Sequence, residues 1–357
     1  ATLADAYHQR GLLAAANGDW TAAIADYDQA IAQDSELATA YFDRGAAQKQ
    51  LGNYAQAATD FEAVVDFDAE NSEAWAQWSD TLAIIGDYTE AIRAGNQAVA
   101  LAPTYDWAYA VRGNAYYRQG DYAAAVADFD QAIALYPDYT WAYAQRANAN
   151  AFLEEYAASV ADATKALEID PSYDYAYAIR GHAHDQLGDQ DAALADFTRA
   201  IELNPNYAYA FYSRGTIYES QGDSAQALAE YSSAVTAEPA YSEALLARGH
   251  LYTEADEYDL ALADYNAALA LDTNNAVAHN DRGVVYELLG DHDAALADYS
   301  AALELRPDYV LVRENRGDLY RRNGQYDEAL ADFEQLLAGN ESAASGYYRR
   351  GLTYEAQ

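Results

Sequence analysis

The sequence predicts an all-α solenoid built by stacking copies of one 34-residue unit, each copy a helix-turn-helix pair. Two observations carry this prediction, a glycine that recurs every 34 residues and a proline that recurs at the same interval. The glycines are Gly18, Gly52, Gly86, Gly120, Gly188, Gly222, Gly290 and Gly324; the prolines are Pro103, Pro137, Pro171, Pro205, Pro239 and Pro307. At two further positions with this 34-residue spacing, Glu154 and Asp256 stand in place of glycine. Because stacked repeats bury their apolar faces against neighbouring repeats, one unbroken period predicts one elongated domain.

The unit Asp106–Tyr139 shows why each copy begins with a helix and then turns. Tyr109 and Tyr116 lie seven residues apart and fall on one stripe of a helix. Gly120 then breaks the helix. Asp121 places a carboxylate at the start of the next helix, where the free backbone N–H groups need an acceptor.

The second half of the same unit predicts a second amphipathic helix. Tyr122, Ala125, Phe129 and Ala132 recur at three- and four-residue spacing, which places them on one buried face. Pro137 cannot continue the helix, so the chain turns back into the next copy. The small residues let the helices approach closely while the aromatic rings fill the remaining space.

These residues resemble the tetratricopeptide repeat family, and the resemblance covers essentially the whole chain. It divides the sequence into ten full repeats over residues 4–343 and a half repeat, or capping helix, over residues 344–357. The resemblance implies a right-handed superhelix of helix pairs whose first helices line a concave groove. We therefore expect a single solenoid domain over residues 1–357.

The chain is strongly acidic, with a formal net charge of −38 and only two lysines. Nucleic-acid backbones and anionic membrane surfaces attract clustered Lys and Arg, so this balance argues against both as partners. No apolar run reaches the length of a membrane span, and we expect no membrane insertion. The absence of cysteine removes disulfides, thiolate metal sites and cysteine nucleophiles from consideration.

Two features of the sequence bear on localisation. The chain begins ATLADAY, a start that resembles a mature chain after cleavage of a signal peptide. It also lacks methionine as well as cysteine, and the absence of both oxidisable residues fits life outside the cytoplasm. We expect an extracytoplasmic protein, secreted or periplasmic, with the cytoplasm as the alternative.

In ten copies of the unit, an arginine directly precedes the position equivalent to Gly113. Nine of these arginines have an acidic residue sixteen residues later. The arginines are Arg10, Arg44, Arg112, Arg146, Arg180, Arg214, Arg248, Arg282, Arg316 and Arg350; the acids are Asp26, Asp60, Asp128, Asp162, Asp196, Glu230, Asp264, Asp298 and Asp332. The third repeat lacks both partners together and carries Trp78 and Ala94. Because losing one partner alone would leave an uncompensated charge, paired loss predicts that the two groups meet as an ion pair between the helices.

The best candidate for a binding site is a set of aromatic residues, which we call the aromatic ladder. Its members are Tyr105, Trp107, Tyr117, Tyr139, Trp141, Tyr173, Tyr175, Tyr207, Tyr209 and Tyr212. The family resemblance places them in or beside the concave groove. Aromatic platforms in an acidic groove suit a cationic or proline-containing peptide, and they also suit the rings of a glycan. Tyrosine fills packing positions of the repeat as well, so packing is the alternative interpretation.

Sites of other kinds find little support in the sequence. His182 and Asp185 lie on one predicted first helix, and His250 lies at the position equivalent to His182 two repeats later. At the usual packing distance between helices, the two histidines are too far apart to bind the same metal ion. No phosphate-binding loop, nucleophile elbow or other catalytic constellation occurs. We expect no cofactor, no metal and no enzymatic activity. The favoured function is a non-catalytic scaffold that binds a protein or peptide partner.

The alternative function is a structural subunit that assembles head to tail into an extracellular filament. Its contact would use basic and aromatic residues near the C-terminal end, namely Arg321, Arg322, Tyr347, Tyr348, Arg349 and Tyr354. These would meet the acidic and apolar first helix of another copy, and such a heterologous contact does not close. One glycosylation acceptor pattern, Asn340-Glu341-Ser342, is also present.

Overall fold

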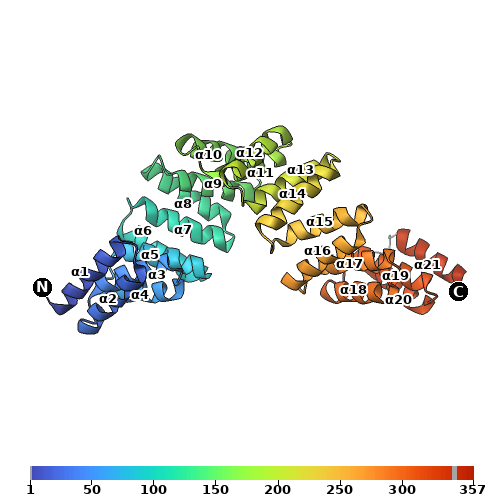
Figure 1. The fold of residues 1–357 in the computed structure, drawn as a ribbon, viewed down its shortest axis with the longest axis horizontal. Coiled ribbons are helices and arrows are strands. Elements are labelled where there is room, and N and C mark those ends of the chain that lie inside the picture. The colour runs from blue at the N-terminus through green and yellow to red at the C-terminus, as the bar shows by residue number, and fades with distance from the viewer. Residues whose placement is uncertain (1, 340–343) are drawn as a thin grey trace. The chain divides into compact units, whose positions relative to one another are not determined.

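The computed structural model describes residues 2–339 and 344–357, and every regular element in those ranges is an α-helix (Figure 1). The helices group into two compact units, Ala1–Arg199 and Ala200–Gln357. Unit 1 holds α1 (Leu3–Ala16), α2 (Trp20–Gln33), α3 (Ala38–Gln50), α4 (Tyr54–Phe67), α5 (Ser72–Ile85), α6 (Tyr88–Leu101), α7 (Asp106–Gln119), α8 (Tyr122–Leu135), α9 (Thr140–Phe152), α10 (Tyr156–Ile169) and α11 (Asp174–Gln186).

The chain passes from one unit to the other within α12 (Gln190–Leu203). Unit 2 holds α13 (Ala208–Ser220), α14 (Ser224–Ala237), α15 (Ser242–Glu254), α16 (Tyr258–Leu271), α17 (Ala276–Leu288), α18 (His292–Leu305), α19 (Val310–Arg322), α20 (Tyr326–Gly339) and α21 (Ala344–Ala356). The prediction of an all-α fold made of 34-residue helix pairs is confirmed. The prediction of one domain over the whole chain stays a prediction.

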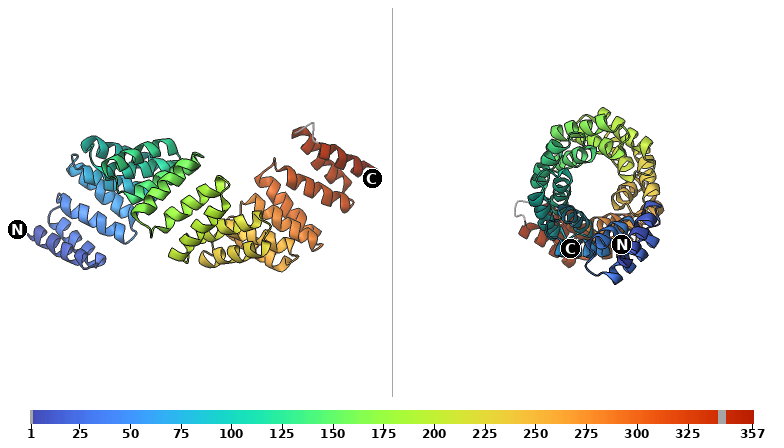
Figure 2. Two further views of the ribbon diagram at one scale, coloured as in Figure 1. Left: turned by 90° about the horizontal axis from the view of Figure 1, so that it is seen from above. Right: turned by 90° about the vertical axis from the view of Figure 1, so that its left-hand side faces the viewer.

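Each unit is a succession of helix pairs in chain order (Figure 2). Every helix within a unit packs against the next one along the chain, as α7 packs on α8 and α8 on α9. Consecutive odd-numbered helices, the first helices of the repeats, also contact one another, including α5 with α7, α9 with α11 and α19 with α21. We call the surface that the first helices form in each unit the first-helix face.

The predicted caps and stops are present at the helix ends. The carboxylate of Asp121 accepts a hydrogen bond from the backbone N–H of Ala124 at 3.1 Å, and Asp19 and Asp291 cap α2 and α18 in the same way. The residue after the second helix is extended, as at Tyr136 ahead of Pro137, so the chain leaves the helix there. These local signals set the length of each helix and hence the register of the repeat.

In eight of the repeats, the core holds an aromatic ring of the second helix packed against a glycine of the first helix. Phe129 is fully buried, and a Cβ added to Gly113 would lie 3.0 Å from its Cε1 atom. The same contact joins Gly11 to Tyr27 and Gly317 to Phe333. Only a residue without a side chain lets the ring approach this closely, so each glycine forms a socket that the ring fills.

Two turns reach a left-handed backbone conformation without glycine. Glu154 has φ of 61° and Asp256 has φ of 60°, whereas Gly120 at the equivalent position has φ of 90°. A non-glycine residue in this conformation is strained by roughly 1 kcal/mol or more. At both turns, therefore, the geometry of the repeat imposes a left-handed backbone conformation that the residue itself does not favour.

Replacing Glu154 by Gly is expected to raise the free energy of unfolding of unit 1 by about 0.5–1 kcal/mol, because the strain is relieved at a modest cost in chain entropy. Urea denaturation followed by circular dichroism measures the change. Gly120→Ala is the matched control and is expected to destabilise by a similar amount. Glu154→Gly leaving stability lower would contradict the argument.

Candidate functional site

The predicted arginine–acid pairs are present in all nine repeats that carry both residues. Arg112 donates from Nε and Nη2 to the two carboxylate oxygens of Asp128, at 2.7 and 2.5 Å. The other pairs are Arg10–Asp26, Arg44–Asp60, Arg146–Asp162, Arg180–Asp196, Arg214–Glu230, Arg248–Asp264, Arg282–Asp298 and Arg316–Asp332. These arginines join the two helices of their own repeat, so the prediction of interhelical ion pairs is confirmed.

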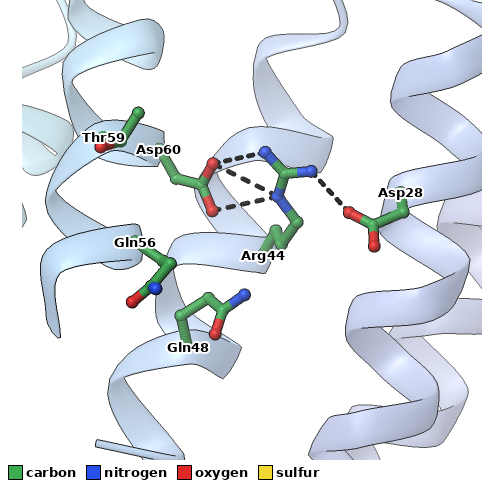
Figure 3. A pocket seen from close by; sticks show the side chains of 6 residues that line it. All are labelled: Asp28, Arg44, Gln48, Gln56, Thr59 and Asp60. Carbon is green, nitrogen blue, oxygen red and sulfur yellow. Dashed lines mark hydrogen bonds and ion pairs between the residues drawn. The ribbon is translucent and has the colours of Figure 1, made fainter. Parts of the chain in front are cut away.

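Several of these arginines also reach back to the preceding repeat, a contact that the sequence analysis missed. Figure 3 shows Arg44 between Asp60 of α4 and Asp28 of α2, with its Nη1 atom 2.6 Å from the Asp28 carboxylate. Arg112 bonds Asn96 in the same way, at 2.8 Å. The partner always lies sixteen residues before the arginine, a spacing visible in the sequence. The arginine is therefore a clamp between three helices.

The polar pocket beside Arg44 follows from this clamp. It has a volume of about 310 Å³ and is lined by Asp28, Arg44, Gln48, Gln56, Thr59 and Asp60 (Figure 3). Its one cation already bonds both of its carboxylates. Burial lowers the pKa of Arg44, but the hydrogen bonds and charges of Asp60 and Asp28 outweigh burial and raise this pKa above its ordinary value. A ligand in this pocket would therefore meet the side chains of glutamine and threonine, because the charged side chains are already paired with one another.

The third repeat replaces the clamp with aromatic packing. Trp78 and Ala94 are buried where the arginine and the acid would stand. The guanidinium of Arg93 lies over the rings of Trp75 and Trp78, 5.4 and 5.3 Å from their centroids, and pairs with Glu90. Loss of the ion pair is thus matched by a cation–π contact on the same helix pair.

In unit 1 the aromatic ladder repeats one geometry. Tyr105 lies 6.0 Å from Trp107 between ring centroids, Tyr139 lies 6.0 Å from Trp141, and Tyr173 lies 5.9 Å from Tyr175. All six rings are half-buried, and Trp141 also places its ring edge against the core residue Phe129. Each pair is therefore anchored in the repeat and still presents part of its surface.

Asn148 ties three first helices together at the ladder. Its Nδ2 atom, on α9, donates to the hydroxyl of Tyr117 on α7 and to that of Tyr175 on α11, both at 2.7 Å. The Tyr117 ring also packs against Tyr122 and Phe152. These contacts fix Tyr117 and Tyr175 in place, which lowers the entropy that a ligand would have to overcome.

One member of the ladder already holds a cation from the same chain. The Lys49 ammonium lies 5.9 Å from the centroid of the Trp107 ring. It also donates to Asp80 and Gln77, both at 2.8 Å. Ring, carboxylate and amide together form a cation-binding arrangement on the first-helix face of unit 1.

The surroundings of the ladder in unit 1 are acidic. Burial, followed by the neighbouring charges of Glu73 and Asp106, raises the pKa of the Tyr105 hydroxyl to about 12. Burial and the charges of Asp106 and Asp80 also raise the pKa of Tyr139. The same carboxylates that disfavour a tyrosinate favour a cation at this surface.

Three ladder residues lie in unit 2. Tyr209 is exposed and lies 6.3 Å from Tyr207 between ring centroids. Tyr212 is half-buried, packs against Tyr231 and Tyr241, and has its pKa raised by burial and by Glu243 and Glu219. Tyr212 is therefore more a packing residue than a platform, whereas Tyr209 is more exposed than the half-buried ladder rings of unit 1.

The residues predicted for self-association fall into two groups. The arginines are paired within the chain: Arg321 with Asp318, Arg322 with Glu287, and Arg349 with Glu314 and Asp318. Tyr347, Tyr348 and Tyr354 are exposed by 49%, 69% and 54%. The charge that the prediction assigned to this contact is thus already neutralised, and its aromatic surface is open.

Other kinds of site are not evident in residues 2–339 and 344–357. No group of three or more His, Cys, Asp or Glu side chains in these ranges could hold a metal ion. His182 instead packs its ring edge near Tyr156, and burial lowers its pKa. None of the helices described is long and apolar enough to cross a membrane. The acceptor pattern at Asn340-Glu341-Ser342 lies outside the described residues.

Family models cover almost the whole chain. Models described as tetratricopeptide repeat match residues 38–71, 107–139, 142–173, 208–241 and 274–342, and one described as TPR repeat matches residues 4–52, 80–120, 181–222 and 249–290. No curated protein matches the chain.

Two solved structures share the fold. A tetratricopeptide repeat protein from Parabacteroides merdae ATCC 43184 matches 69% of this chain and 97% of its own, at 17% identity and a TM-score of 0.56. The APC/C hetero-tetramer Cut9–Hcn1 matches 97% of this chain and 89% of its own, at 13% identity and a TM-score of 0.56. YrrB, described as a TPR protein with an unusual peptide-binding site, matches 52% of this chain and 95% of its own, at 26% identity and a TM-score of 0.43.

Proposed function

This chain belongs to the tetratricopeptide repeat family, and from that premise we propose that it is a non-catalytic scaffold whose aromatic ladder binds a cationic or proline-containing peptide segment of a protein partner. The proposal places the peptide in a concave groove on the first-helix face of unit 1, between Trp107 and Tyr175. It also places the protein outside the cytoplasm, on the composition of the chain.

The observation that carries the proposal is the cation held at Trp107. Lys49 is neutralised by Asp80 and lies over the indole, so this surface already performs the recognition that a ligand lysine or arginine would need. Trp141, one repeat further on, has the same tyrosine companion and has no cation over its ring in the described part of the chain. A peptide cation would occupy the equivalent place there, and proline rings would stack on the remaining aromatic surfaces.

Replacing Trp107 and Trp141 together by Ala is expected to weaken binding of an arginine- and proline-containing peptide by about 100-fold, because each ring supplies both stacking and cation–π contact. A peptide library read by fluorescence polarisation identifies the tightest probe and measures the change. Phe67→Ala is the matched control, since Phe67 is an exposed aromatic residue at the end of a second helix. Undiminished binding by the double variant, with its fold intact by circular dichroism, would refute the assignment.

Lys49→Ala is expected to act in the opposite direction on the same peptide. It removes the internal cation from Trp107 and Asp80, so a peptide cation no longer competes with it. We expect affinity to rise by about threefold to tenfold, with the gain lost when Asp80 is changed to Asn. Weaker binding by Lys49→Ala would mean that Lys49 itself contacts the peptide.

The second candidate function is the extracellular filament, which the exposed Tyr347, Tyr348 and Tyr354 favour together with the exposed Leu3 and Leu13 of α1. Apolar surface of this kind commonly marks an interface. Negative-stain electron microscopy across a concentration series separates the two functions. Fibres that disappear when residues 344–357 are removed would support the filament, whereas discrete particles at every concentration would support the scaffold.

A further inference from the structure

A pocket in unit 2 departs from the repeat pattern at several positions at once. It has a volume of about 250 Å³ and is lined by the turn residues Pro205 and Asn206 and by residues of α13 and α14. We infer that this pocket binds one neutral sugar ring, which packs on Phe211 and forms hydrogen bonds through its hydroxyl groups. The site is separate from the aromatic ladder, and the inference does not rest on the proposed function.

The first departure is Phe211, which stands where several other repeats carry a ring with a polar atom. The Tyr109 hydroxyl donates to the carbonyl oxygen of Pro103, six residues earlier, at 3.3 Å. The same hydrogen bond, again to the residue six positions earlier, is made by Tyr41, Trp75 and Tyr177. Phe211 has no donor, so the carbonyl of Pro205 lacks this bond, and both residues line the pocket.

The second departure is Ala237, the last residue of α14. Seven other second helices end in a large apolar residue at the equivalent position, namely Phe67, Leu101, Leu135, Ile169, Leu203, Leu271 and Leu305. Ala237 lines the pocket, so the space that a leucine would fill belongs to the cavity. The loss of a hydroxyl and the loss of a large side chain thus occur in the same repeat and open the same place.

The lining of this pocket is polar, and no charged side chain contributes to it in the described part of the chain. Ser233 and Thr236 donate their hydroxyl protons to carbonyl oxygens of their own helix, at 2.9 and 2.7 Å, so their oxygens remain as acceptors. Ser232 adds a hydroxyl and Asn206 adds an amide. The pocket is therefore rich in acceptors, which is complementary to a ligand with many O–H donors.

The lack of charge distinguishes this pocket from others on the same acidic protein. The pocket beside Arg44 contains two carboxylates, and another pocket of unit 1 is lined by Asp43, Asp68 and Glu73. A cationic ligand is attracted to surfaces of that kind. The pocket at Phe211 offers hydrogen bonds and an aromatic ring without a carboxylate, so it favours a neutral ligand.

A pyranose ring has the chemistry that this lining requires. Its hydroxyl groups donate hydrogen bonds around the rim, and its C–H bonds carry the partial positive charge that the face of an aromatic ring attracts. The guanidinium of Arg214 lies over the Phe211 ring, 5.9 Å from the centroid, and helps to hold that ring in place. Pockets for drug-sized ligands measure roughly 300–1,000 Å³, so this smaller volume fits a single ring.

The test follows the backbone amide of Phe211 by NMR while sugars are added to the whole chain. Isotope-labelled phenylalanine gives eight amide signals, and the signal of Phe211 is the one that Phe211→Tyr removes. The probes are the methyl glycosides of glucose, galactose, mannose and N-acetylglucosamine. We expect at least one probe to shift this signal with a Kd of about 1–10 mM, because few hydrogen bonds on an open site give weak affinity. No shift with any of the four would overturn the inference.

Two variants restore residues that other repeats carry, so both are expected to fold. Phe211→Tyr supplies the hydroxyl that bonds the turn carbonyl elsewhere, and Ala237→Leu fills the cavity. We expect each variant to weaken binding about tenfold or more, measured by saturation transfer from the protein to the sugar. Leu271→Ala changes the equivalent position of the next repeat and is the control, with binding unchanged. Binding that neither Phe211→Tyr nor Ala237→Leu weakens would overturn the inference.

Charged forms of the same ring test the preference for a neutral ligand. We expect protonated glucosamine and glucuronate to bind more weakly than methyl glucoside. Tighter binding of glucosamine would show that the pocket selects a cation, and this result would overturn the inference. A free sugar and the end of a glycan chain supply the same ring. Tighter binding of glucose than of methyl glucoside indicates a free sugar, equal binding indicates the end of a glycan, and both results support the inference.

Discussion

Asp128→Ala is expected to lower the free energy of unfolding of unit 1 by about 3–5 kcal/mol, because it leaves the Arg112 guanidinium buried without its carboxylate. The side chain of Arg112 is only 16% exposed, and its Nε and Nη2 atoms both donate to Asp128. The remaining bond to Asn96 is to a neutral amide and does not balance the charge. Urea denaturation measures the loss, and hydrogen exchange should locate it in α7 and α8.

Asp26→Ala is the matched control for this prediction, since it deletes the same carboxylate in the first repeat. The Arg10 side chain that it leaves behind is 64% exposed and can be hydrated, so the expected loss of stability is much smaller than that for Asp128→Ala. Replacing Arg112 and Asp128 together by Leu is expected to be much milder than Asp128→Ala alone, as the apolar third repeat already suggests. Equal losses for Asp26→Ala and Asp128→Ala would show that burial of the arginine is not the cause.

The ion pairs could be predicted from the sequence because both partners are charged and disappear together. The backward contact of the same arginines could not, because its partner changes in chemical type from Asp28 to Asn96 to Thr164. Each of these can accept a hydrogen bond, yet only the first carries a charge. A pattern of identical residues is visible in a sequence, whereas a pattern of shared acceptor capacity becomes visible only when the helices are placed.

The candidate site was predicted less completely than the fold. The spacing identified Trp107 and Trp141 as platforms, but it gave no sign that Lys49, two repeats earlier, lies over Trp107. That contact depends on how far one repeat rotates relative to the next, a quantity that side-chain packing sets and local propensity does not. The same reason hid the pairing of Arg349 with Glu314, which joins first helices of adjacent repeats.

The stability of the protein is expected to fall steeply between pH 10 and pH 12 because buried tyrosines resist ionisation. Burial and nearby Asp43 and Asp26 raise the pKa of Tyr27 to about 12, and Tyr105 has a pKa of about 12. An unfolded tyrosine releases its proton near pH 10. Between these values the unfolded state binds fewer protons than the folded state, so stability decreases as pH rises. Tyr27, which is 1% exposed, alone contributes a loss of about 2 kcal/mol at pH 12.

Tyr27→Phe isolates this effect, because the ring that fills the Gly11 socket is kept and the ionisable hydroxyl is removed. Urea denaturation at pH 8 should give nearly the same stability for the variant and the parent, and at pH 12 the variant should be more stable by about 2 kcal/mol. Tyrosinate absorbance recorded in the same experiment should rise together with unfolding for the buried rings. An unchanged difference between pH 8 and pH 12 would mean that the Tyr27 hydroxyl reaches solvent and ionises in the folded protein, and the packing of ring on glycine would then be looser than the contact at Gly11 indicates.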